Sequence, residues 1–352
     1  MAQKIVTPGR IQNDSPPAGQ PDMMRAIVQH QYGAPQAVLE LQDIAKPVIK
    51  DDEVLVRVHA ASIHVGDWIL MRGVPYVVRM ASGLRKPKSR VPGTDIAGTV
   101  EAVGKDVTQL RPGDEVFGWC MGAFAEYACA AEDHFVPKPA NLTFEQAAAV
   151  GVSASTALQL LRDQGKVQPG QKVLINGASG GVGTFAVQIA KAFGAEVTGV
   201  CGTRNVDMVH SIGADHVIDY TQEDFTQGEQ RYDVILDNVA NHSLSDTRRV
   251  LTSTGRLQSN NGTAGGRWFG TMGTVMKTTA VSMFDKRQLG PHIKFVNRKD
   301  HEVLKGFIED GKIRPVIDTT FQLSGTPEAI GHVGEGHARG TVVITMNGAH
   351  HA

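Results

Sequence analysis

The sequence predicts an α/β protein in which a β-rich domain is joined to a domain built on a doubly wound parallel sheet. Three observations support this fold class. A short apolar strand, a glycine-rich turn and a helix with an apolar face follow one another over residues 173–190. Strands and helices alternate along residues 172–258, which is the pattern of a parallel sheet covered by helices. Before residue 150, strand-like segments dominate.

Composition limits the classes of protein to which the chain can belong. Its 352 residues suffice for two domains, and 35 Lys and Arg balance 36 Asp and Glu. The net charge of −1 excludes a broad basic field for nucleic acid or an anionic membrane, so only a local patch could bind phosphate. No apolar run reaches the ~20 residues that cross a bilayer. Three cysteines without metal-site spacing indicate a reducing compartment. We therefore expect a cytoplasmic protein without a nucleic-acid partner or membrane insertion.

The N-terminal part of the chain begins with an extension and continues in strands. Residues 1–23 are polar and rich in Pro and Gly, so we expect them to be disordered. Strand patterns follow at 25–29 and 53–59, the second with the alternation of a half-buried strand. The basic run 79–90 is interpreted as a solvated loop, and the alternative is a contact with substrate or phosphate. A turn and a strand are expected over 91–104.

The second half of the chain alternates between helix and strand patterns. A helical pattern over 143–161 breaks around Gly151. The strands expected in the parallel sheet are 172–176, 196–200, 216–219, 232–237 and 255–258, with helices near 181–193, 206–212 and 243–251 between them. A strand at 292–296, a helix at 299–311 and a strand at 340–345 complete the pattern.

The glycine-rich turn at 178–183 is the first candidate binding site. Three glycines in four positions allow backbone N–H groups to converge on an anion at the helix N-terminus, as a dinucleotide pyrophosphate requires. Alanine at position 178 replaces the first glycine of the usual fingerprint. The alternative is a turn that only packs a helix on a strand. The residues expected to contact the cofactor are Ser179, Gly180, Gly181 and Val182.

Four motifs, in this order and spacing, resemble the medium-chain dehydrogenase/reductase superfamily, and within it the zinc-independent quinone oxidoreductases. They are Pro92-Gly-Thr-Asp-Ile-Ala-Gly98, Arg111-Pro-Gly-Asp-Glu-Val-Phe-Gly118, Gly122-Ala-Phe-Ala-Glu-Tyr127 and Ala178-Ser-Gly-Gly-Val-Gly183. The resemblance implies a GroES-like catalytic domain at 24–150, a Rossmann NADPH-binding domain at 151–291, and a return of residues 292–352 to the first domain. Dimers are common in this superfamily, so a homodimer is left open.

The choice between nicotinamide cofactors depends on the end of the second strand of the Rossmann domain. A site that prefers NAD needs an acidic residue there, about 20 residues beyond the first glycine. Residues 199–205 contain no carboxylate, whereas Arg204 offers a planar fork of donors for a phosphate, beside Thr203. We therefore predict NADPH as the cofactor. The alternative for Arg204 is a surface arginine at a helix start.

Five further positions are predicted to lie at the cofactor. The resemblance implies that Tyr220 lies beside the adenine, with simple edge packing as the alternative, and that Arg339 is a basic group near the cofactor. It also implies that Thr156 touches the nicotinamide region; the alternative is a helix hydroxyl bonded to its own backbone. Asn238 and Asn261 follow successive strands at the carboxyl end of the sheet, where open α/β sheets bind ligands.

The zinc ligands of the alcohol dehydrogenases can be compared position by position. The resemblance implies that these three positions are occupied by His64, Thr94 and about Val150 in this chain. A catalytic zinc needs three protein ligands and an open position, and only the histidine can serve. The sequence therefore predicts a zinc-independent site.

The reaction expected is hydride transfer from NADPH to a quinone or an α,β-unsaturated carbonyl, because these acceptors need no Lewis acid. His64 is a candidate hydrogen-bond donor or proton source, since histidine titrates near neutral pH. Its alternative role is the local hydrogen bonding of the asparagine that relatives carry. Tyr76 is the candidate proton donor by resemblance to enoyl reductases, although it falls one residue late, and its alternative is packing or lining the cleft. The rival functions are an NADPH-binding protein with little turnover and a zinc-dependent alcohol dehydrogenase.

Overall fold

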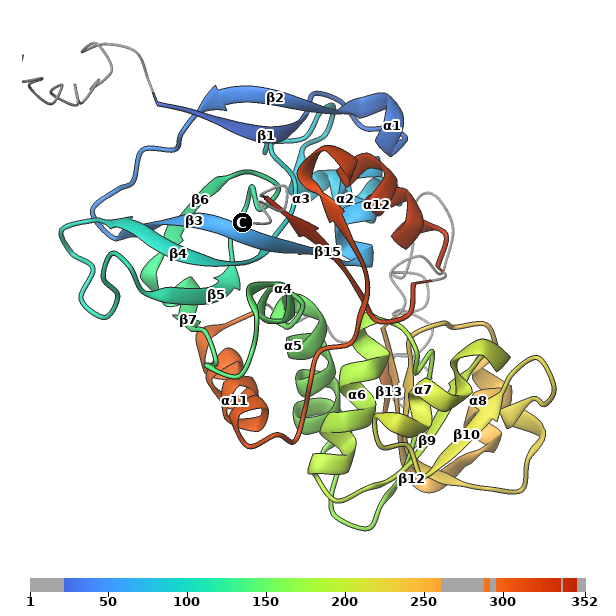
Figure 1. Ribbon diagram of the computed structural model, residues 1–352. Helices are drawn as coiled ribbons and strands as arrows, with labels where there is room; N and C mark the ends of the chain where they lie inside the picture. The colour runs from blue at the N-terminus through green and yellow to red at the C-terminus, as the bar shows by residue number, and fades with distance from the viewer. Residues whose placement is uncertain (1–21, 261–287, 292–295, 337, 347–352) are drawn as a thin grey trace, which may run out of the picture.

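The computed structural model describes residues 22–260, 288–291, 296–336 and 338–346, and two large sheets organise them. Figure 1 shows the mixed sheet in the upper part of the molecule and the parallel sheet in the lower part. This arrangement confirms the predicted fold class. Within the described residues no helix is both long enough and apolar enough to span a bilayer.

The parallel sheet has six strands in the order β10-β9-β8-β11-β12-β13. Their bounds are β8 (Lys172–Asn176), β9 (Glu196–Cys201), β10 (His216–Asp219), β11 (Tyr232–Asp237), β12 (Leu251–Ser259) and β13 (Gln288–Pro291). The helices of this part are α6 (Gly181–Ala192), α7 (Val206–Ser211) and α8 (Leu244–Arg249). The first strand lies at the centre, and the chain reverses its direction of winding between β8 and β11, where sheets of this kind bind their ligands.

The mixed sheet has the order β14-β15-β3-β4-β5-β7, and β6 pairs with β3. Its strands are β3 (Glu53–Ile63), β4 (Asp95–Val103), β5 (Glu115–Trp119), β6 (Tyr127–Ala131), β7 (Phe135–Pro137), β14 (Ile317–Gln322) and β15 (Thr341–Thr345). A separate two-stranded sheet contains β1 (Met23–Gln29) and β2 (Leu39–Ala45). Because β15 pairs with β3, the end of the chain returns to the strands formed at its beginning.

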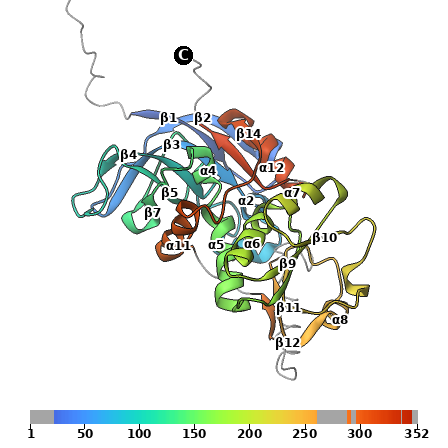
Figure 2. The same cartoon turned by 60° about the horizontal axis from the view of Figure 1, so that its bottom comes forward.

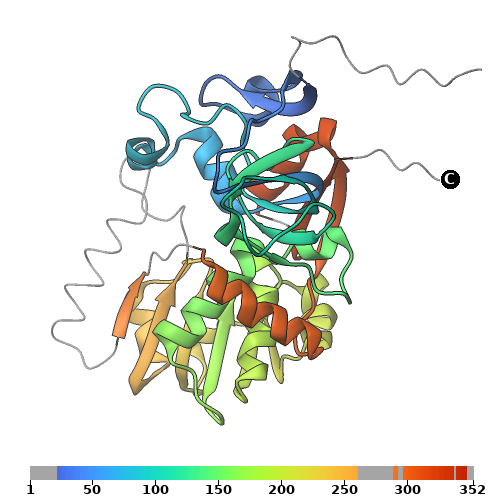
Figure 3. The same cartoon turned by 90° about the vertical axis from the view of Figure 1, so that its left-hand side faces the viewer.

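Helices fill the space between and around the sheets. The helices outside the parallel sheet are α1 (Pro35–Val38), α2 (Val65–Arg72), α3 (Arg79–Ser82), α4 (Phe144–Ala148), α5 (Gly151–Gln159), α11 (Arg298–Glu309) and α12 (Thr326–Gly334). Helix α4 packs on the mixed sheet, while α5 packs on α6. Helix α11 lies alongside α5 at the junction, as Figures 2 and 3 show from two sides.

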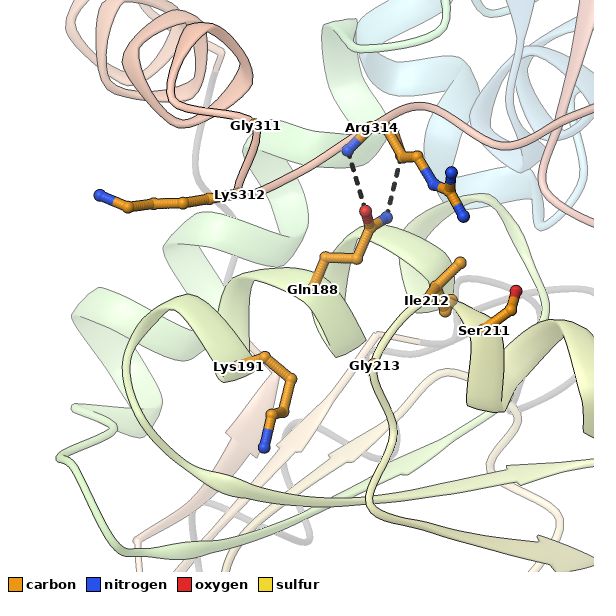
Figure 4. A pocket seen from close by; sticks show the side chains of 8 residues that line it. All are labelled: Gln188, Lys191, Ser211, Ile212, Gly213, Gly311, Lys312 and Arg314. Atoms are coloured by element: carbon orange, nitrogen blue, oxygen red, sulfur yellow. Dashed lines mark hydrogen bonds between the residues drawn. The ribbon is translucent and has the colours of Figure 1, made fainter.

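One hydrophobic core connects the two sheets. It includes Ala60 and Phe117 of the mixed sheet and Val173 and Ile175 of the parallel sheet, all fully buried. The small residues of α4 and α5 allow this close approach. Gln188 of α6 adds a polar tie: its side chain both donates to and accepts from the backbone of Arg314, at 2.9 Å each (Figure 4).

Most of the expected elements are present, with informative differences. Strand β11 has the predicted bounds, while β3 extends four residues past the expected end at His59. The basic run is not a loop throughout, because its first residues form α3, which Gly83 ends. Of the strand expected at 292–296, residues 292–295 lie outside the described residues. The domain boundaries at 24–150, 151–291 and 292–352 stay predictions.

Buried Asp300 links α11 to α5 and the π-helical segment that follows it (Leu160–Gly165). Its carboxylate accepts hydrogen bonds from Gln159 at 2.6 Å, Arg162 at 2.7 Å and Asn297 at 2.7 Å. We expect Asp300→Ala to lower the free energy of unfolding by about 3 kcal/mol, because three bonds to a buried charge are lost. The measurement is urea unfolding followed by circular dichroism.

The matched control is Asp310→Ala. Asp310 pairs with Lys312 at 2.8 Å, but both side chains are about half exposed, so its loss should change the same free energy by less than about 0.5 kcal/mol. Equal effects of the two substitutions would show that the junction does not depend on Asp300.

Candidate active site

The glycine turn joins β8 to α6 at the carboxyl edge of the parallel sheet. Gly180 is the N-cap of α6, and no side chain among the described residues caps this helix. A Cβ on Gly183 would overlap the carbonyl oxygen of Gly177, which itself has a φ of +76°. Only glycine satisfies both positions. The first N–H groups of a 12-residue helix are thereby left for an anion such as a pyrophosphate.

The C-terminal segment is fastened to this turn. The N–H of Gly340 donates to the carbonyl of Ser179 at 2.8 Å, so the neighbouring Arg339 lies beside the turn. Strand β15 begins at the next residue, and Val342 pairs with Ile63 of β3. The residue after Ile63 is His64. The glycine turn and His64 are therefore held in one frame by a short series of backbone hydrogen bonds.

The predicted phosphate contacts lie in a single helical turn after β9 (Thr203–Asn205). Thr203 and Arg204 are exposed, whereas Asn205 is buried and its amide donates to Ser179 Oγ at 3.1 Å. This bond connects the end of β9 to the glycine turn. The structure therefore brings Ser179, Thr203 and Arg204 to the same edge of the sheet.

A carboxylate that the sequence analysis missed lies beside them. Asp219 ends β10, opposite Cys201 at the end of β9, and its Oδ2 accepts the hydroxyl proton of Thr203 at 2.6 Å. That hydrogen bond lowers the pKa of Asp219. The expected acid of an NAD site belongs to the end of β9, and Asp219 ends the neighbouring strand instead. An acidic residue at the end of the adjacent strand is the sequence feature that identifies Asp219.

The remaining predicted cofactor residues are placed as follows. Tyr220 is 62% exposed, and its hydroxyl would lie 3.2 Å from a Cβ at Gly202, so its ring stands against the end of β9. The Asn238 amide donates to the carbonyl of Asn176 at 3.1 Å, which ties it to the end of β8. Thr156 is half-buried in α5. Asn261 lies outside the described residues.

His64 lies at the start of α2 in a group of polar side chains. Its Nε2 is 2.8 Å from Thr94 Oγ1 and 3.4 Å from Asp67 Oδ2, and its backbone N–H donates to the same oxygen of Asp67 at 2.9 Å. A Cβ on Gly66 would lie 2.7 Å from the imidazole, so glycine there leaves room for the ring. These contacts hold the imidazole against the Thr94 hydroxyl.

A second carboxylate, Asp95, lies beneath this group. It accepts the N–H of Val152 in α5 at 2.9 Å and the hydroxyl of Ser62 at 3.4 Å. Burial raises the pKa of Asp95 to about 6 and raises that of Asp67, while the charge of His64 opposes both shifts. One histidine thus faces two buried carboxylates.

The three positions of the zinc ligands do not fit a zinc ion. Thr94 is hydrogen-bonded to His64, and Val150 is apolar and fully buried. His64 alone offers a good donor, whereas a catalytic zinc takes three protein ligands. Nowhere in the described part of the chain do three or more His, Cys, Asp or Glu side chains gather as a metal site would require.

Tyr76 lies beyond the other end of α2, in a single helical turn (Tyr76–Val78). The guanidinium of Arg79 lies 4.8 Å from the centre of its ring and 4.5 Å from that of Tyr32. Tyr76 is half-buried. The two predicted catalytic residues are therefore positioned by different elements: His64 by the end of β3, and Tyr76 by its stacking with Arg79.

A depression in the surface lies at the C-terminal end of α6, remote from the glycine turn at its N-terminal end. Lys191 there pairs with Asp215 and Lys312 with Asp310. Figure 4 shows that the side chains of Lys191, Lys312 and Arg314 point in different directions. They do not form a cradle for one ligand.

Comparisons with known proteins support the fold of this chain. Residues 50–140 match the family model described as alcohol dehydrogenase GroES-like domain, and residues 212–344 match that described as zinc-binding dehydrogenase. The quinone oxidoreductase of Homo sapiens is 32% identical over 92% of this chain and 98% of its own length. A quinone oxidoreductase homolog of Spinacia oleracea, chloroplastic, has the same identity and the same coverage.

Solved structures show the same architecture. The quinone oxidoreductase from Coxiella burnetii superposes with a TM-score of 0.81 at 30% identity, covering 93% of this chain and all of the other. An NAD-dependent alcohol dehydrogenase superposes with a TM-score of 0.79 at 27% identity, covering 92% of this chain and all of the other.

Another titratable group at the domain junction is His301 of α11, which is fully buried beside Phe117 and Trp119. Burial lowers the pKa of His301 to about 4. Asp95 and His301 therefore have opposite effects on stability over nearly the same pH range. Folding holds the proton of Asp95 to higher pH than the unfolded chain does, and it releases the proton of His301 at lower pH.

We expect the free energy of unfolding of Asp95→Asn to rise steeply with pH between about pH 4 and 6.5. The unfolded chain loses the Asp95 proton near pH 4 and the folded chain near pH 6, so in the wild type this group costs stability as pH rises through that window, by about 3 kcal/mol. His301 adds stability from about pH 4 to 6.5 by a similar amount. The two largely cancel in the wild type.

The check is urea unfolding from pH 4 to 7 for wild type, Asp95→Asn and His301→Leu. With increasing pH, the free energy of unfolding should only rise in Asp95→Asn and only fall in His301→Leu. A pH dependence shared by all three proteins would contradict these assignments.

Proposed function

Because this chain belongs to the medium-chain dehydrogenase/reductase superfamily, in its quinone oxidoreductase-like branch, we propose that it is an NADPH-dependent, zinc-independent reductase that transfers hydride to a quinone or an α,β-unsaturated carbonyl. Members of this family bind a nicotinamide cofactor. The observation that carries the proposal is the fixed connection between the uncapped N-terminus of α6 and His64 through residues 340–342.

The residues present fit a dinucleotide. The glycine turn leaves the first N–H groups of α6 for the pyrophosphate. Arg339 lies beside the same turn, because the next residue, Gly340, is hydrogen-bonded to Ser179. Tyr220 presents an exposed ring at the end of β10, where an adenine can stack. When bound, the nicotinamide supplies the hydride. The protein holds the acceptor against the nicotinamide ring and supplies a proton to it.

His64 and Thr94 are proposed to supply that proton. The Asp67 carboxylate 3.4 Å from Nε2 favours the tautomer that carries its hydrogen there. In that tautomer His64 donates to Thr94 Oγ1, and the Thr94 hydroxyl proton is left for another acceptor. Thr94 is half-buried, so it is not sealed inside the core. Without a Lewis acid, charge that develops on a carbonyl oxygen must meet such a donor or water.

The preference for NADPH rests on Arg204, and Asp219 opposes it. Arg204 is exposed at the end of β9 and suits a 2′-phosphate, whereas the nearby carboxylate of Asp219 repels a phosphate and suits a ribose hydroxyl. We favour NADPH because an arginine–phosphate pair is bidentate with charge on both groups, whereas a hydrogen bond from a ribose hydroxyl to Asp219 carries charge on the carboxylate alone.

The test of the activity is cofactor oxidation against quinones, short alkenals and cyclic enones. We expect NADPH to be consumed with at least one of these classes and not with saturated ketones. Tight NADPH binding without consumption would favour the rival, a binding protein with little turnover. Metal analysis that finds one zinc per chain would favour the zinc alcohol dehydrogenase.

We expect Arg204→Ala to weaken NADPH binding by at least about 10-fold and NADH binding by less than about 2-fold, because only NADPH carries the phosphate that the guanidinium binds. The measurement is fluorescence titration with both cofactors. The control is Arg231→Ala, an exposed arginine whose described hydrogen bonds are to neighbouring carbonyls. Equal losses of affinity for NADPH and NADH would show that Arg204 does not bind the 2′-phosphate. The preference between the two cofactors would then depend on Asp219.

We expect His64→Asn to lower kcat by at least about 10-fold with little change in KM, because asparagine keeps a hydrogen bond to Thr94 but holds no transferable proton. The fall of kcat at high pH, which a general acid produces, should also be absent in this variant. The matched control is His59→Asn, since His59, on the strand that precedes His64, bonds Thr99 Oγ1 at 3.0 Å. Wild-type kcat in the His64 variant would leave this histidine with an orienting role only.

A further inference from the structure

Residues 68–94 carry an unbalanced charge. They contain six cations and no acidic residue, so the remainder of the chain has a net charge of −7 although the whole chain has −1. The six are Arg72, Arg79, Arg85, Lys86, Lys88 and Arg90. The net charge of −1 therefore conceals one strongly basic segment.

Two of these cations are used within the fold, and four are not. Arg72 lies over the ring of Trp68, and Arg79 donates to the carbonyl of Gly73 between two tyrosine rings. The other four side chains are exposed. In the part of the chain that the structure describes, none of the four forms an ion pair.

The segment that carries these four cations, residues 80–90, is held in a defined shape; we call it the basic loop. The N–H of Lys88 donates to the carbonyl of Ser82 at 2.8 Å, and the Tyr32 hydroxyl donates to that of Gly83 at 2.6 Å. Gly83 has a φ of +122°, and a Cβ there would overlap the carbonyl oxygen of Lys86. At the base of the loop, Gln29 of β1 donates to the carbonyl of Arg90 at 2.7 Å.

Two large apolar side chains stand out of the same loop. Met80 is 74% exposed and Leu84 is 73% exposed, on either side of the end of α3. Single exposed apolar residues are common on protein surfaces. Here, however, two of them occur among four cations that form no ion pair with the described residues, on a loop that hydrogen bonds hold in a defined shape. Figure 3 shows that α3 lies at the outer edge of the upper part of the molecule.

We propose that the basic loop docks the protein peripherally on an anionic phospholipid surface. Arg85, Lys86, Lys88 and Arg90 face the lipid phosphates, while Met80 and Leu84 enter the headgroup region. Charge complementarity selects an anionic partner. The apolar pair selects lipid over nucleic acid, because apolar side chains gain nothing from a phosphodiester backbone. This mode of binding needs no membrane-spanning segment, and it does not depend on the proposed activity.

The test is co-sedimentation of the full-length protein with vesicles at 0.1 M salt. We expect binding to vesicles of 30% phosphatidylserine in phosphatidylcholine, little binding to pure phosphatidylcholine, and loss of binding at 0.5 M salt because the charges are screened. Arg85→Ala/Lys86→Ala should lower the partition coefficient about 25-fold, since each cation near such a surface contributes roughly five-fold.

A second variant separates the apolar part from the charge. Leu84→Ser should lower the partition coefficient several-fold while leaving the dependence on salt unchanged. The controls are Arg111→Ala/Lys299→Ala, which removes two exposed cations elsewhere, and Val48→Ser, which removes an apolar side chain that is 90% exposed. Both controls should bind as the wild type does. Unchanged thermal unfolding establishes that each variant is folded.

Several outcomes would overturn the proposal. Equal binding to neutral and anionic vesicles would remove the role of the cations, and equal losses in loop and control variants would remove the role of the loop. Absence of vesicle binding, together with salt-sensitive binding of a nucleic acid or an acidic protein at the same residues, would assign the loop to that other partner.

Discussion

The hydrogen bond from the N–H of Gly340 to the carbonyl of Ser179 fixes the geometry of the site. It joins the glycine turn of the parallel sheet to the last strand of the mixed sheet. Gly340 has a φ of +98°, and a Cβ there would overlap the carbonyl oxygen of Val316, so no other residue allows the chain to pass. One backbone bond contributes only about 1 kcal/mol. Its importance is positional, since β15 continues from it to pair with β3 and so places His64 relative to the turn.

Local features of the fold could be predicted because they lie within a short window of sequence. The apolar run within 232–237 marks β11, and the glycines at 180–183 mark the start of α6. The proximity of Asp219 to Thr203 could not be found in this way, because it depends on which strands are neighbours in the sheet. The basic run was interpreted from its charge alone. That charge does not reveal that Gly83 and Tyr32 hold the segment in shape.

The polar group at His64 combines one imidazole with two buried carboxylates. Asp67 and Asp95 are both fully buried, and two carboxylates without a cation would be very costly there. A single imidazole can balance only one of them. The raised pKa values of both acids are the consequence, since a proton lowers the charge that burial penalises. Asp95 thus keeps its proton to about pH 6, where exposed aspartates have lost theirs.

The position of Asp219 restricts how a 2′-phosphate could be bound. A phosphate needs donors, but Thr203 has one hydroxyl proton and gives it to Asp219 at 2.6 Å. Asn205 is poorly placed to replace it, because its side chain is buried and one amide N–H is already donated to Ser179. Recognition of the phosphate therefore falls on Arg204 among these side chains, together with the backbone of the turn. A single arginine beside an ionised carboxylate favours NADPH less strongly than two donors would, so the discrimination against NADH is expected to be incomplete.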